Sequence, residues 1–257
     1  MPPKTIFITG AAAGIGKETA LYFAQKGWYI GLFDIDEAGL GRLAAEIGET
    51  RCCVHLIDVR DEVSVRDAIN FFSSQTDGRM NVLFNNAGII NAGDIDSISL
   101  ANHKRLIDIN IWGVLNCTIQ ALPLLKKTQP ATIVNMSSAS AIYGHPSLTT
   151  YAASKMAVRS ITEGLDIGLA KHGIKVRDLM PIWVKTSLAN TLATEWSGLK
   201  KSDVKITPQA VAQKVWQAVH GRRLHWLMGA ETRFYNVLTK ILPNSITRIS
   251  ARFILRD

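Results

Sequence analysis

The chain alternates short, largely apolar segments with longer segments of helical periodicity, and this alternation constrains the fold more than any other feature of the sequence. Seven of the short segments have the length and the residue types of buried strands. They span residues 5–9, 28–33, 51–57, 80–84, 131–136, 174–180 and 224–228. Because strands that alternate with helices form parallel sheets, we expect an α/β fold with a seven-stranded, parallel, doubly wound sheet and helices on both faces.

The alternating pattern runs through most of the 257 residues with no linker and no second pattern, so we expect residues 1–257 to form a single domain. Two segments fall outside the pattern. A polar, irregular stretch covers residues 186–205, and an amphipathic helical extension covers residues 229–257.

A glycine-rich turn joins the first expected strand to the helix that follows it. Gly10, Gly14 and Gly16 have the spacing G-x-x-x-G-x-G, with Ile15 between the last two. Such a turn presents backbone N–H groups and a helix N-terminus to a pyrophosphate, and glycine lets the backbone approach the ligand closely. A tight turn that binds nothing is the alternative, but the strand before it and the helix after it favour dinucleotide binding.

An acidic residue stands at the end of the second strand. Asp34 follows Gly16 by eighteen residues, where an acid can accept hydrogen bonds from an adenosine ribose diol. Its charge would repel a 2′-phosphate, so it favours NAD over NADP. Asp34 could instead cap a helix, but Asp36 suits that role better because it directly precedes Glu37.

The fourth strand runs into Asn85, Asn86, Ala87 and Gly88. Small and amide residues at the carboxyl end of a strand suit a loop that passes close to a ligand and hydrogen-bonds it. An Asx-turn is the alternative, since two asparagines also favour that structure.

Tyr151 and Lys155 lie four residues apart, so in a helix both side chains project from one face. A tyrosine has an unperturbed pKa of ~10, and a positive charge at ~4 Å is worth ~4 kcal/mol, which can lower that pKa toward neutrality. Ser138 ends the fifth strand, and a strand end and the next helix start meet at one edge of a parallel sheet. Ser138 and Tyr151 can therefore converge.

Asn110 interrupts an apolar helical pattern that covers residues 100–127. An asparagine is unfavourable inside a helix unless it has a specific role, such as holding a water or perturbing the helix. Exposure on the surface is the alternative.

These motifs, in this order and spacing, resemble the short-chain dehydrogenase/reductase family. The resemblance rests on the turn at residues 9–16, the loop at residues 85–88, Asn110, Ser138, Tyr151-x-x-x-Lys155 and Thr186. It implies a Rossmann fold, a nicotinamide cofactor, and hydride transfer between an alcohol and a ketone or aldehyde. It also implies homodimers or homotetramers through the helices at residues 100–127 and 150–171.

The resemblance further implies a role for each matching residue. Tyr151 would be the acid/base, Lys155 would lower its pKa and bind the ribose, Ser138 would orient the substrate oxygen, and Asn110 would hold a water. No metal site is expected. Cofactor contacts are implied at Gly10, Gly14, Ile15, Gly16, Asp34, Asp58, Val59, Asn86, Ala87, Gly88, Tyr151, Lys155, Val184 and Thr186.

Three positions depart from the family pattern. Ile182 follows Pro181 where relatives usually have glycine, which alters the turn that leads to Thr186. Ala141 replaces a frequent glycine and predicts a crowded substrate entrance. Ala13 stands where relatives that prefer NADP tend to carry a basic residue, in agreement with a preference for NAD.

The sequence does not identify the substrate. Tyr143, His145, Trp183 and residues 186–205 are expected to shape its site, with His145 more typical of a solvated loop. Nearby apolar residues favour a hydrophobic alcohol or ketone: Ile142, Ile182, Trp183, Leu188 and Leu192. Two alternatives remain. The first is a reductase of carrier-bound 3-oxoacyl thioesters, which Asp34 disfavours because biosynthetic reduction usually draws on NADPH. The second is a non-catalytic dinucleotide-binding protein, which would not need all four of Asn110, Ser138, Tyr151 and Lys155.

The cysteines Cys52, Cys53 and Cys117 lack metal-binding spacing, which indicates buried, reduced thiols and a cytoplasmic protein. The N-terminus leads directly into a strand pattern, so no signal peptide is expected. The sequence contains no run of eighteen apolar residues, so no transmembrane helix is expected.

The net charge of +8 is concentrated near the C-terminus, where residues 221–257 hold seven basic and two acidic residues, a net +5. Apolar residues recur at helical spacing over residues 234–242 and again over 246–254, while Arg248, Arg252 and Arg256 lie on another face. Packing on the core or on a partner subunit is the commoner use of such a pattern. Contact of residues 244–256 with an anionic membrane surface is the alternative. Nucleic-acid binding is not expected, because no aromatic residues interleave with the basic ones.

Overall fold

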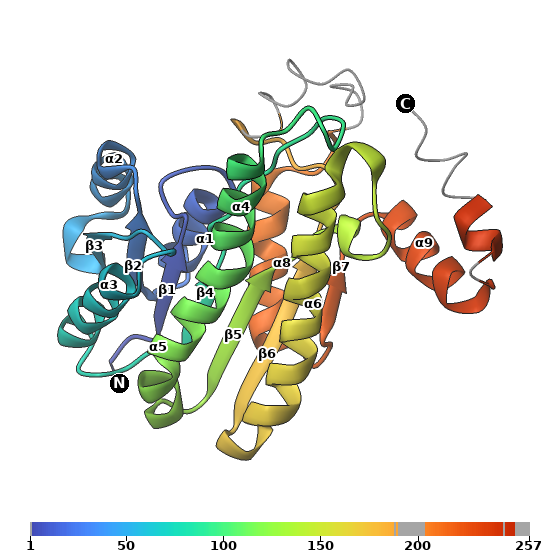
Figure 1. The fold of residues 1–257 in the computed structure, drawn as a ribbon. Coiled ribbons are helices and arrows are strands. Elements are labelled where there is room, and N and C mark those ends of the chain that lie inside the picture. Colours follow the sequence, from blue (N-terminus) through green and yellow to red (C-terminus); the bar gives the residue numbers. More distant parts are fainter. Residues whose placement is uncertain (1, 188, 190–203, 244, 250–257) are drawn as a thin grey trace.

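The computed structural model describes residues 2–187, 189, 204–243 and 245–249. This part of the chain contains a sheet of seven strands in the order β3-β2-β1-β4-β5-β6-β7, and every neighbouring pair is parallel (Figure 1). The predicted seven-stranded parallel sheet is therefore confirmed. The strands are β1 (Thr5–Thr9), β2 (Tyr29–Asp34), β3 (Cys52–Leu56), β4 (Val82–Asn85), β5 (Ala131–Met136), β6 (Ile174–Met180) and β7 (His225–Leu227).

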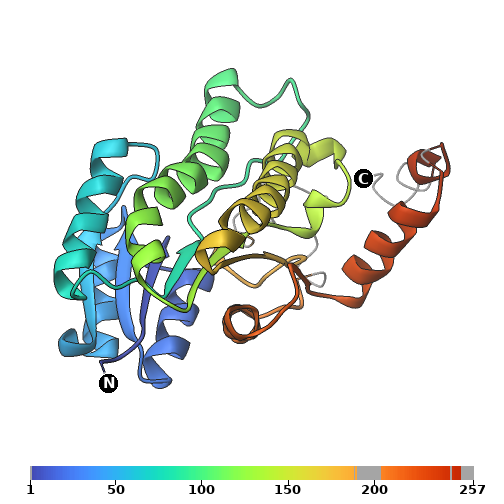
Figure 2. The ribbon, with the colours of Figure 1, turned by 90° about the horizontal axis from the view of Figure 1, so that it is seen from below.

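Helices cover both faces of the sheet (Figure 2). On one face α1, α2 and α8 pack against the strands, and on the other α3, α5 and α6 do so. Helix α9 lies beyond β7, at the opposite end of the sheet from α2 and α3 (Figure 1). The helices are α1 (Gly14–Gln25), α2 (Glu37–Ile47), α3 (Glu62–Gln75), α4 (Leu100–Ile107), α5 (Gly113–Lys127), α6 (Thr149–Leu169), α8 (Pro208–His220) and α9 (Ala230–Ile241).

The period-two alternation of strand side chains builds one core on each face. Ile6 and Ile8 of β1 belong to the core beneath α1 and α8, whereas Phe7 belongs to the core beneath α3. Phe7 stacks on Phe33 with ring centroids 3.7 Å apart, and Phe72 of α3 meets it edge-on. Because both faces are covered, the strands appear in the sequence as nearly continuous apolar runs.

Several predictions about single residues are confirmed by the structure. Asp36 caps α2, as predicted, by accepting a hydrogen bond from Gly39 N. The three cysteines are buried and form no disulfide, and burial raises the pKa of each thiol. Among the described residues, every helix is too short or too polar to cross a bilayer.

The helix expected at residues 100–127 is interrupted in the structure. A π-helical turn (Asp108–Trp112) separates α4 from α5, and the buried Asn110 lies within it. Turns of this kind are frequent at functional sites. The prediction that Asn110 could perturb the helix is therefore confirmed.

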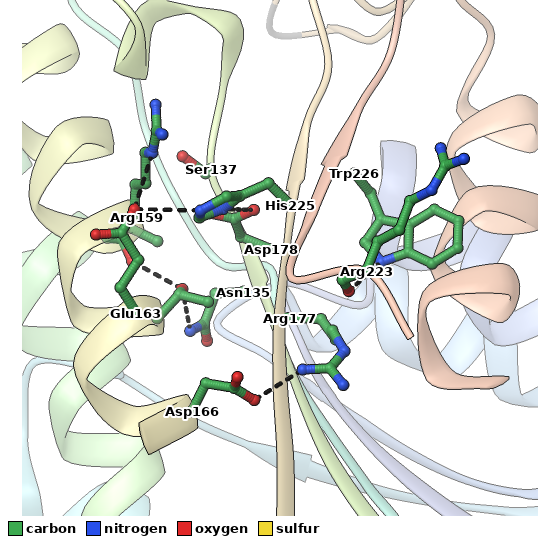
Figure 3. Close-up of polar contacts among 12 residues, drawn as sticks. Asn135, Ser137, Arg159, Glu163, Asp166, Arg177, Asp178, Arg223, His225 and Trp226 are labelled. Carbon is green, nitrogen blue, oxygen red and sulfur yellow. Dashed lines mark hydrogen bonds and ion pairs between the residues drawn. The ribbon is translucent and has the colours of Figure 1, made fainter. Parts of the chain in front are cut away.

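Polar contacts, buried on the side of the strands, hold α6 against β6 and β7 (Figure 3). The carboxylate of Asp178, which is fully buried in β6, accepts a hydrogen bond from His225 Nδ1 at 2.9 Å. His225 Nε2 lies 3.1 Å from Glu163 Oε1 on α6, and Arg177 Nη1 lies 2.7 Å from Asp166 Oδ1. Burial raises the pKa of Asp178, and the hydrogen bond from His225 acts in the opposite direction. These contacts fix the position of α6 relative to the end of the sheet.

Candidate active site

A cavity of about 870 Å³ opens at the carboxyl edge of the sheet. This volume lies within the range of roughly 300–1,000 Å³ that is typical of ligand sites. Its walls come from the segments that follow β1 to β6 and from α9. A parallel sheet places all these strand ends on one side, so motifs far apart in the sequence meet there.

The glycine-rich turn forms one wall of the cavity. Gly10 and Gly14 have φ angles of 66° and 53°, a conformation that favours glycine. Gly16 is required for another reason, since a Cβ there would stand 2.0 Å from the carbonyl oxygen of Gly10. Ala13, Gly14 and Ile15 line the cavity where α1 begins, with no side-chain cap and no acid in its first turn. The N–H groups at this end of the helix therefore fit a pyrophosphate.

Asp34 lines the cavity near this turn. Its Oδ2 accepts a hydrogen bond from Ala12 N at 2.9 Å, and its Oδ1 accepts one from Ile35 N at 2.7 Å. The backbone thereby holds the carboxylate in one orientation. Since Asp36 caps α2, the alternative role of Asp34 as that cap is wrong.

Asp58 and Val59 lie in the same end of the cavity. Arg60 forms an ion pair with Asp58 at 2.6 Å, and this hydrogen-bonded contact holds the pKa of the carboxyl below its usual range. The Val59 carbonyl accepts a hydrogen bond at 3.0 Å from Nδ2 of Asn116, a buried residue of α5. The implied cofactor contacts of Asp58 and Val59 stay predictions.

Residues 86–88 also line the cavity, but the Asn86 side chain is used within the protein. Its Nδ2 donates to the carbonyl oxygens of Thr9 and Gly10, both at 3.0 Å. The Thr9 hydroxyl accepts from the backbone N–H groups of Asn86 and Ala87. Asn86 therefore holds the glycine-rich turn in place, a role that sequence reasoning missed.

Val184 and Thr186 follow β6 and line the cavity as well. Val184 forms an isolated parallel bridge with Ile206. A Cβ on Gly14 would stand 3.2 Å from Thr186 Cγ2, so Thr186 lies beside the glycine-rich turn although Ile182 replaces the usual glycine.

Tyr151, Ser138 and Lys155 meet in the cavity wall. The Ser138 hydroxyl lies near enough to the Tyr151 phenol to favour its anion, and it also accepts a hydrogen bond from Ser140 N at 3.2 Å. The Lys155 amine lies 5.6 Å from the centroid of the Tyr151 ring and donates to the Met136 carbonyl at 2.9 Å. A Cβ on Gly88 would stand 3.5 Å from this amine. The structure thus brings together a phenol, a hydroxyl and an amine that come from two separate elements.

Burial changes the pKa values of both ionisable groups. It raises the pKa of Tyr151, while the hydrogen bond with Ser138 acts in the opposite direction. Loss of hydration lowers the pKa of Lys155 to about 8. The prediction that Lys155 brings the pKa of Tyr151 down toward neutrality is wrong for the protein by itself, because desolvation of the phenol outweighs the groups that favour its anion.

Asn110 is buried, so the alternative of surface exposure is excluded. Its Oδ1 accepts from Ile89 N at 2.9 Å, and its Nδ2 donates to Ile89 O at 2.9 Å and to Ser154 Oγ at 3.1 Å. Both of its N–H groups are used to join the loop after β4 to α6. The implied role of Asn110 in holding a water stays a prediction, and only its oxygen retains capacity for it.

The other end of the cavity is largely apolar. Its aliphatic and aromatic lining includes Ile90, Ile142, Leu148, Ile182, Trp183 and Phe234. Tyr143 meets Tyr235 of α9 edge-on with ring centroids 6.4 Å apart, and His145 lines the wall rather than a solvated loop. Leu188 and Leu192, which were expected here, lie outside the described residues, as does most of residues 186–205.

Sequence reasoning missed part of the cavity. Arg60, Arg105, Glu231, Thr232, Phe234 and Tyr235 also line it. The position of Arg60, two residues after Asp58, offered a signal for an ion pair. The α9 residues offered none, because only the folded chain brings that helix to the cavity.

A parallel sheet with a glycine-rich turn, an acid after β2 and an apolar cavity at its carboxyl edge defines a Rossmann-type dinucleotide-binding protein. The family model described as short chain dehydrogenase matches residues 4–196. The chain belongs to this family, whose members use nicotinamide cofactors, and it is an oxidoreductase.

Individual relatives agree with this assignment. Oxidoreductase UcpA of Salmonella typhimurium is 36% identical over 224 residues, which cover 86% of this chain and 82% of the relative. The 3-ketoacyl-(acyl-carrier-protein) reductase of Brucella melitensis, solved with NADH, matches with a TM-score of 0.80 and 28% identity over 88% of this chain and 96% of that chain. A short chain dehydrogenase/reductase of Burkholderia phymatum, solved with NAD, has a TM-score of 0.82 and 25% identity over 96% and 95% of the two chains.

A glycine-to-alanine pair tests the glycine-rich turn. Gly16→Ala should weaken NADH binding at least tenfold, because its Cβ would collide with the Gly10 carbonyl and displace the turn. Gly41→Ala, with nothing within 4 Å of the added Cβ, should bind NADH normally and gain about 0.5–1 kcal/mol of stability in α2. NADH fluorescence titration and urea unfolding measure both effects, and equal affinity of the two variants would contradict the role of the turn.

Proposed function

We propose that this protein is an NAD-dependent dehydrogenase that interconverts a hydrophobic secondary alcohol and the corresponding ketone, or an aldehyde. The observation that supports this function best is that Tyr151, Ser138 and Lys155 line one cavity together, with the Lys155 amine 5.6 Å from the Tyr151 ring. A proton donor, a neutral hydrogen-bond donor and a cation at one point suit a reaction that builds negative charge on an oxygen.

Each residue has a defined part in this proposal. Tyr151 Oη gives its proton to the substrate oxygen during reduction and takes a proton from the hydroxyl during oxidation. Ser138 Oγ donates a hydrogen bond that orients the same oxygen. The Lys155 cation stabilises the phenolate and binds the ribose hydroxyls, and Asn110 positions the loop after β4 against α6. When bound, the nicotinamide ring donates or accepts the hydride.

The cofactor site supports NAD as the dinucleotide. Gly10, Gly14, Ile15 and Gly16 hold the pyrophosphate at the start of α1. Asp34 accepts hydrogen bonds from the ribose diol, and its charge disfavours the 2′-phosphate of NADP. The contacts proposed for the rest of the cofactor lie in residues 58–59, 86–88, 184 and 186.

Reduction of a 3-oxoacyl thioester is a second candidate, and the relative from Brucella melitensis favours it. That reductase was solved with NADH, so an acid at the position of Asp34 does not argue against a thioester substrate. A panel of secondary alcohols and 3-hydroxyacyl thioesters, followed by NADH absorbance, distinguishes the two substrate classes.

Exposed apolar side chains on the predicted dimer helices support a homo-oligomer through residues 100–127 and 150–171. Trp112 and Ile119 are 50% and 61% exposed, and Ile167 of α6 is 81% exposed. Exposed apolar surface of this kind favours contact with another subunit. The three buried free thiols suit a reducing compartment, and we infer the cytoplasm.

The catalytic assignment is tested by Tyr151→Phe, which keeps the ring and removes the proton. Turnover should fall at least about 1,000-fold, while the dissociation constant for NADH stays within about twofold. Tyr22→Phe on α1 is the matched control and should keep full activity. Equal turnover of Tyr151→Phe and the wild type would show that the dinucleotide site serves a non-catalytic protein or another chemistry.

The cofactor preference is tested by Asp34→Asn, which keeps the size and an acceptor oxygen but removes the charge. For the wild type, kcat/KM with NADH should exceed that with NADPH at least about 100-fold, because the carboxylate repels the 2′-phosphate. Asp34→Asn should reduce this ratio at least tenfold. Asp36→Asn, which preserves a good helix cap, should leave it unchanged. If Asp34→Asn and Asp36→Asn gave the same ratio of kcat/KM with NADH to kcat/KM with NADPH, Asp34 would not select the cofactor.

The pKa directions predict opposite pH dependences for the two directions of the reaction. Oxidation needs an ionised Tyr151, whose pKa is raised, so its kcat/KM should rise with pH above 7. Reduction needs a protonated Tyr151 and a charged Lys155, so its kcat/KM should fall as the pH passes about 8. Initial rates over the pH range from about 6 to 10 measure both profiles. An oxidation rate that is flat above pH 7 would argue against Tyr151 as the base.

A further inference from the structure

Exposed apolar side chains gather on α9 and on the helical residues 245–249 that follow it. Phe234, Val237 and Ile241 are 68%, 53% and 74% exposed, and Ile246 and Ile249 are 46% and 54% exposed. The helix lies at the outer end of the sheet beyond β7, and both views show it standing apart from the other helices (Figures 1 and 2). The apolar face expected to pack on the core is therefore turned to solvent.

Basic side chains lie along one flank of this face. At about 100° per residue, Phe234, Val237 and Ile241 fall within an arc of about 60°, and Arg233 and Lys240 lie within about 20° of each other beside it. Both basic residues are exposed. Arg248 adds a third exposed cation, and residues 232–249 contain no acidic residue.

We propose that α9 and residues 245–249 dock on a bilayer that contains anionic phospholipids. An apolar face with a basic flank has the amphipathic pattern of a helix that lies in the membrane interface. A second copy of the chain suits the surface less well. Two-fold pairing of the face would bring Arg233 and Lys240 of both copies together, and the acidic residue of α9, Glu231, lines the cavity and does not lie on the basic flank.

The adjoining side of α9 borders the cavity, and Phe234 belongs both to the apolar face and to the cavity lining. Thr232 is buried, and Tyr235 lines the cavity wall against Tyr143. Docking would thus place the apolar end of the cavity next to the lipid, from which a hydrophobic alcohol or ketone can enter. This consequence rests on the proposed function, whereas docking itself does not and is measured without turnover.

Vesicle sedimentation of the full-length protein tests the docking. The protein should bind vesicles of phosphatidylcholine mixed with phosphatidylglycerol, should bind pure phosphatidylcholine much less, and should be released by salt. Replacing Arg233, Lys240 and Arg248 by glutamine should weaken binding roughly a hundredfold. Val237→Ser combined with Ile241→Ser should weaken it at least about tenfold, because two apolar side chains would no longer enter the interface.

Matched controls lie far from α9. Val63→Ser on α3 removes an apolar side chain that is 50% exposed, and Lys126→Gln with Lys127→Gln removes charge from α5. These variants should sediment as the wild type does, and thermal unfolding should confirm that all variants are folded. Equal loss in the control variants, or no binding by the wild type, would overturn the proposal. A lower mass of the Val237→Ser/Ile241→Ser variant in light scattering, with unchanged sedimentation, would instead assign the face to a second copy.

Discussion

The contact between α6 and the carboxyl end of β5 is the constraint on which the site depends. Lys155 Nζ donates to the Met136 carbonyl at 2.9 Å, and Ser137 Oγ donates to the Lys155 carbonyl at 3.0 Å. These two bonds set the register of the helix against the strand. Tyr151, about one turn before Lys155, then meets Ser138, the residue after Ser137. A shift of the helix by one residue would turn Tyr151 by about 100° and separate the pair.

This edge of the sheet buries many polar groups that hydrogen-bond to one another, although Asn85 Oδ1 and Asp178 Oδ2 have no partner among the described residues. A buried polar group without a partner costs about 1–3 kcal/mol, so such a cluster is stable only when its members pair. Asn85 donates to Asn135, and Asn135 donates to Thr162 of α6. His225 of β7 is hydrogen-bonded to Asp178 of β6. The same burial lowers the pKa of Lys155 and raises that of Tyr151. The rigidity of the site and its unusual pKa values therefore have one cause.

Much of the fold was predictable because the central strands β1, β4 and β5 are buried on both faces and so appear as largely apolar runs. The predicted strand at residues 28–33 differs by one residue at each end from β2 (Tyr29–Asp34). Asn110 pointed to a perturbed helix, but its position in a π-helical turn was not predicted, since its hydrogen bonds reach Ile89 and Ser154 in other segments. The pKa of Tyr151 was predicted in the wrong direction, because an estimate from one neighbouring charge omits the desolvation that burial brings.

The sequence by itself determined the order of strands and helices, the residues at each strand end and the basic charge of the C-terminal segment. These properties depend only on local sequence, that is, on residue types and on their periodicity over short stretches of the chain. Only the tertiary structure decided that Asn86 holds the glycine-rich turn, that Asn110 joins a loop to α6, and that α9 presents its apolar face to solvent. The physical reason is distance along the chain. Asn86 bonds Thr9 across 77 residues, and the partners and burial of a side chain are set by such remote segments once they fold together.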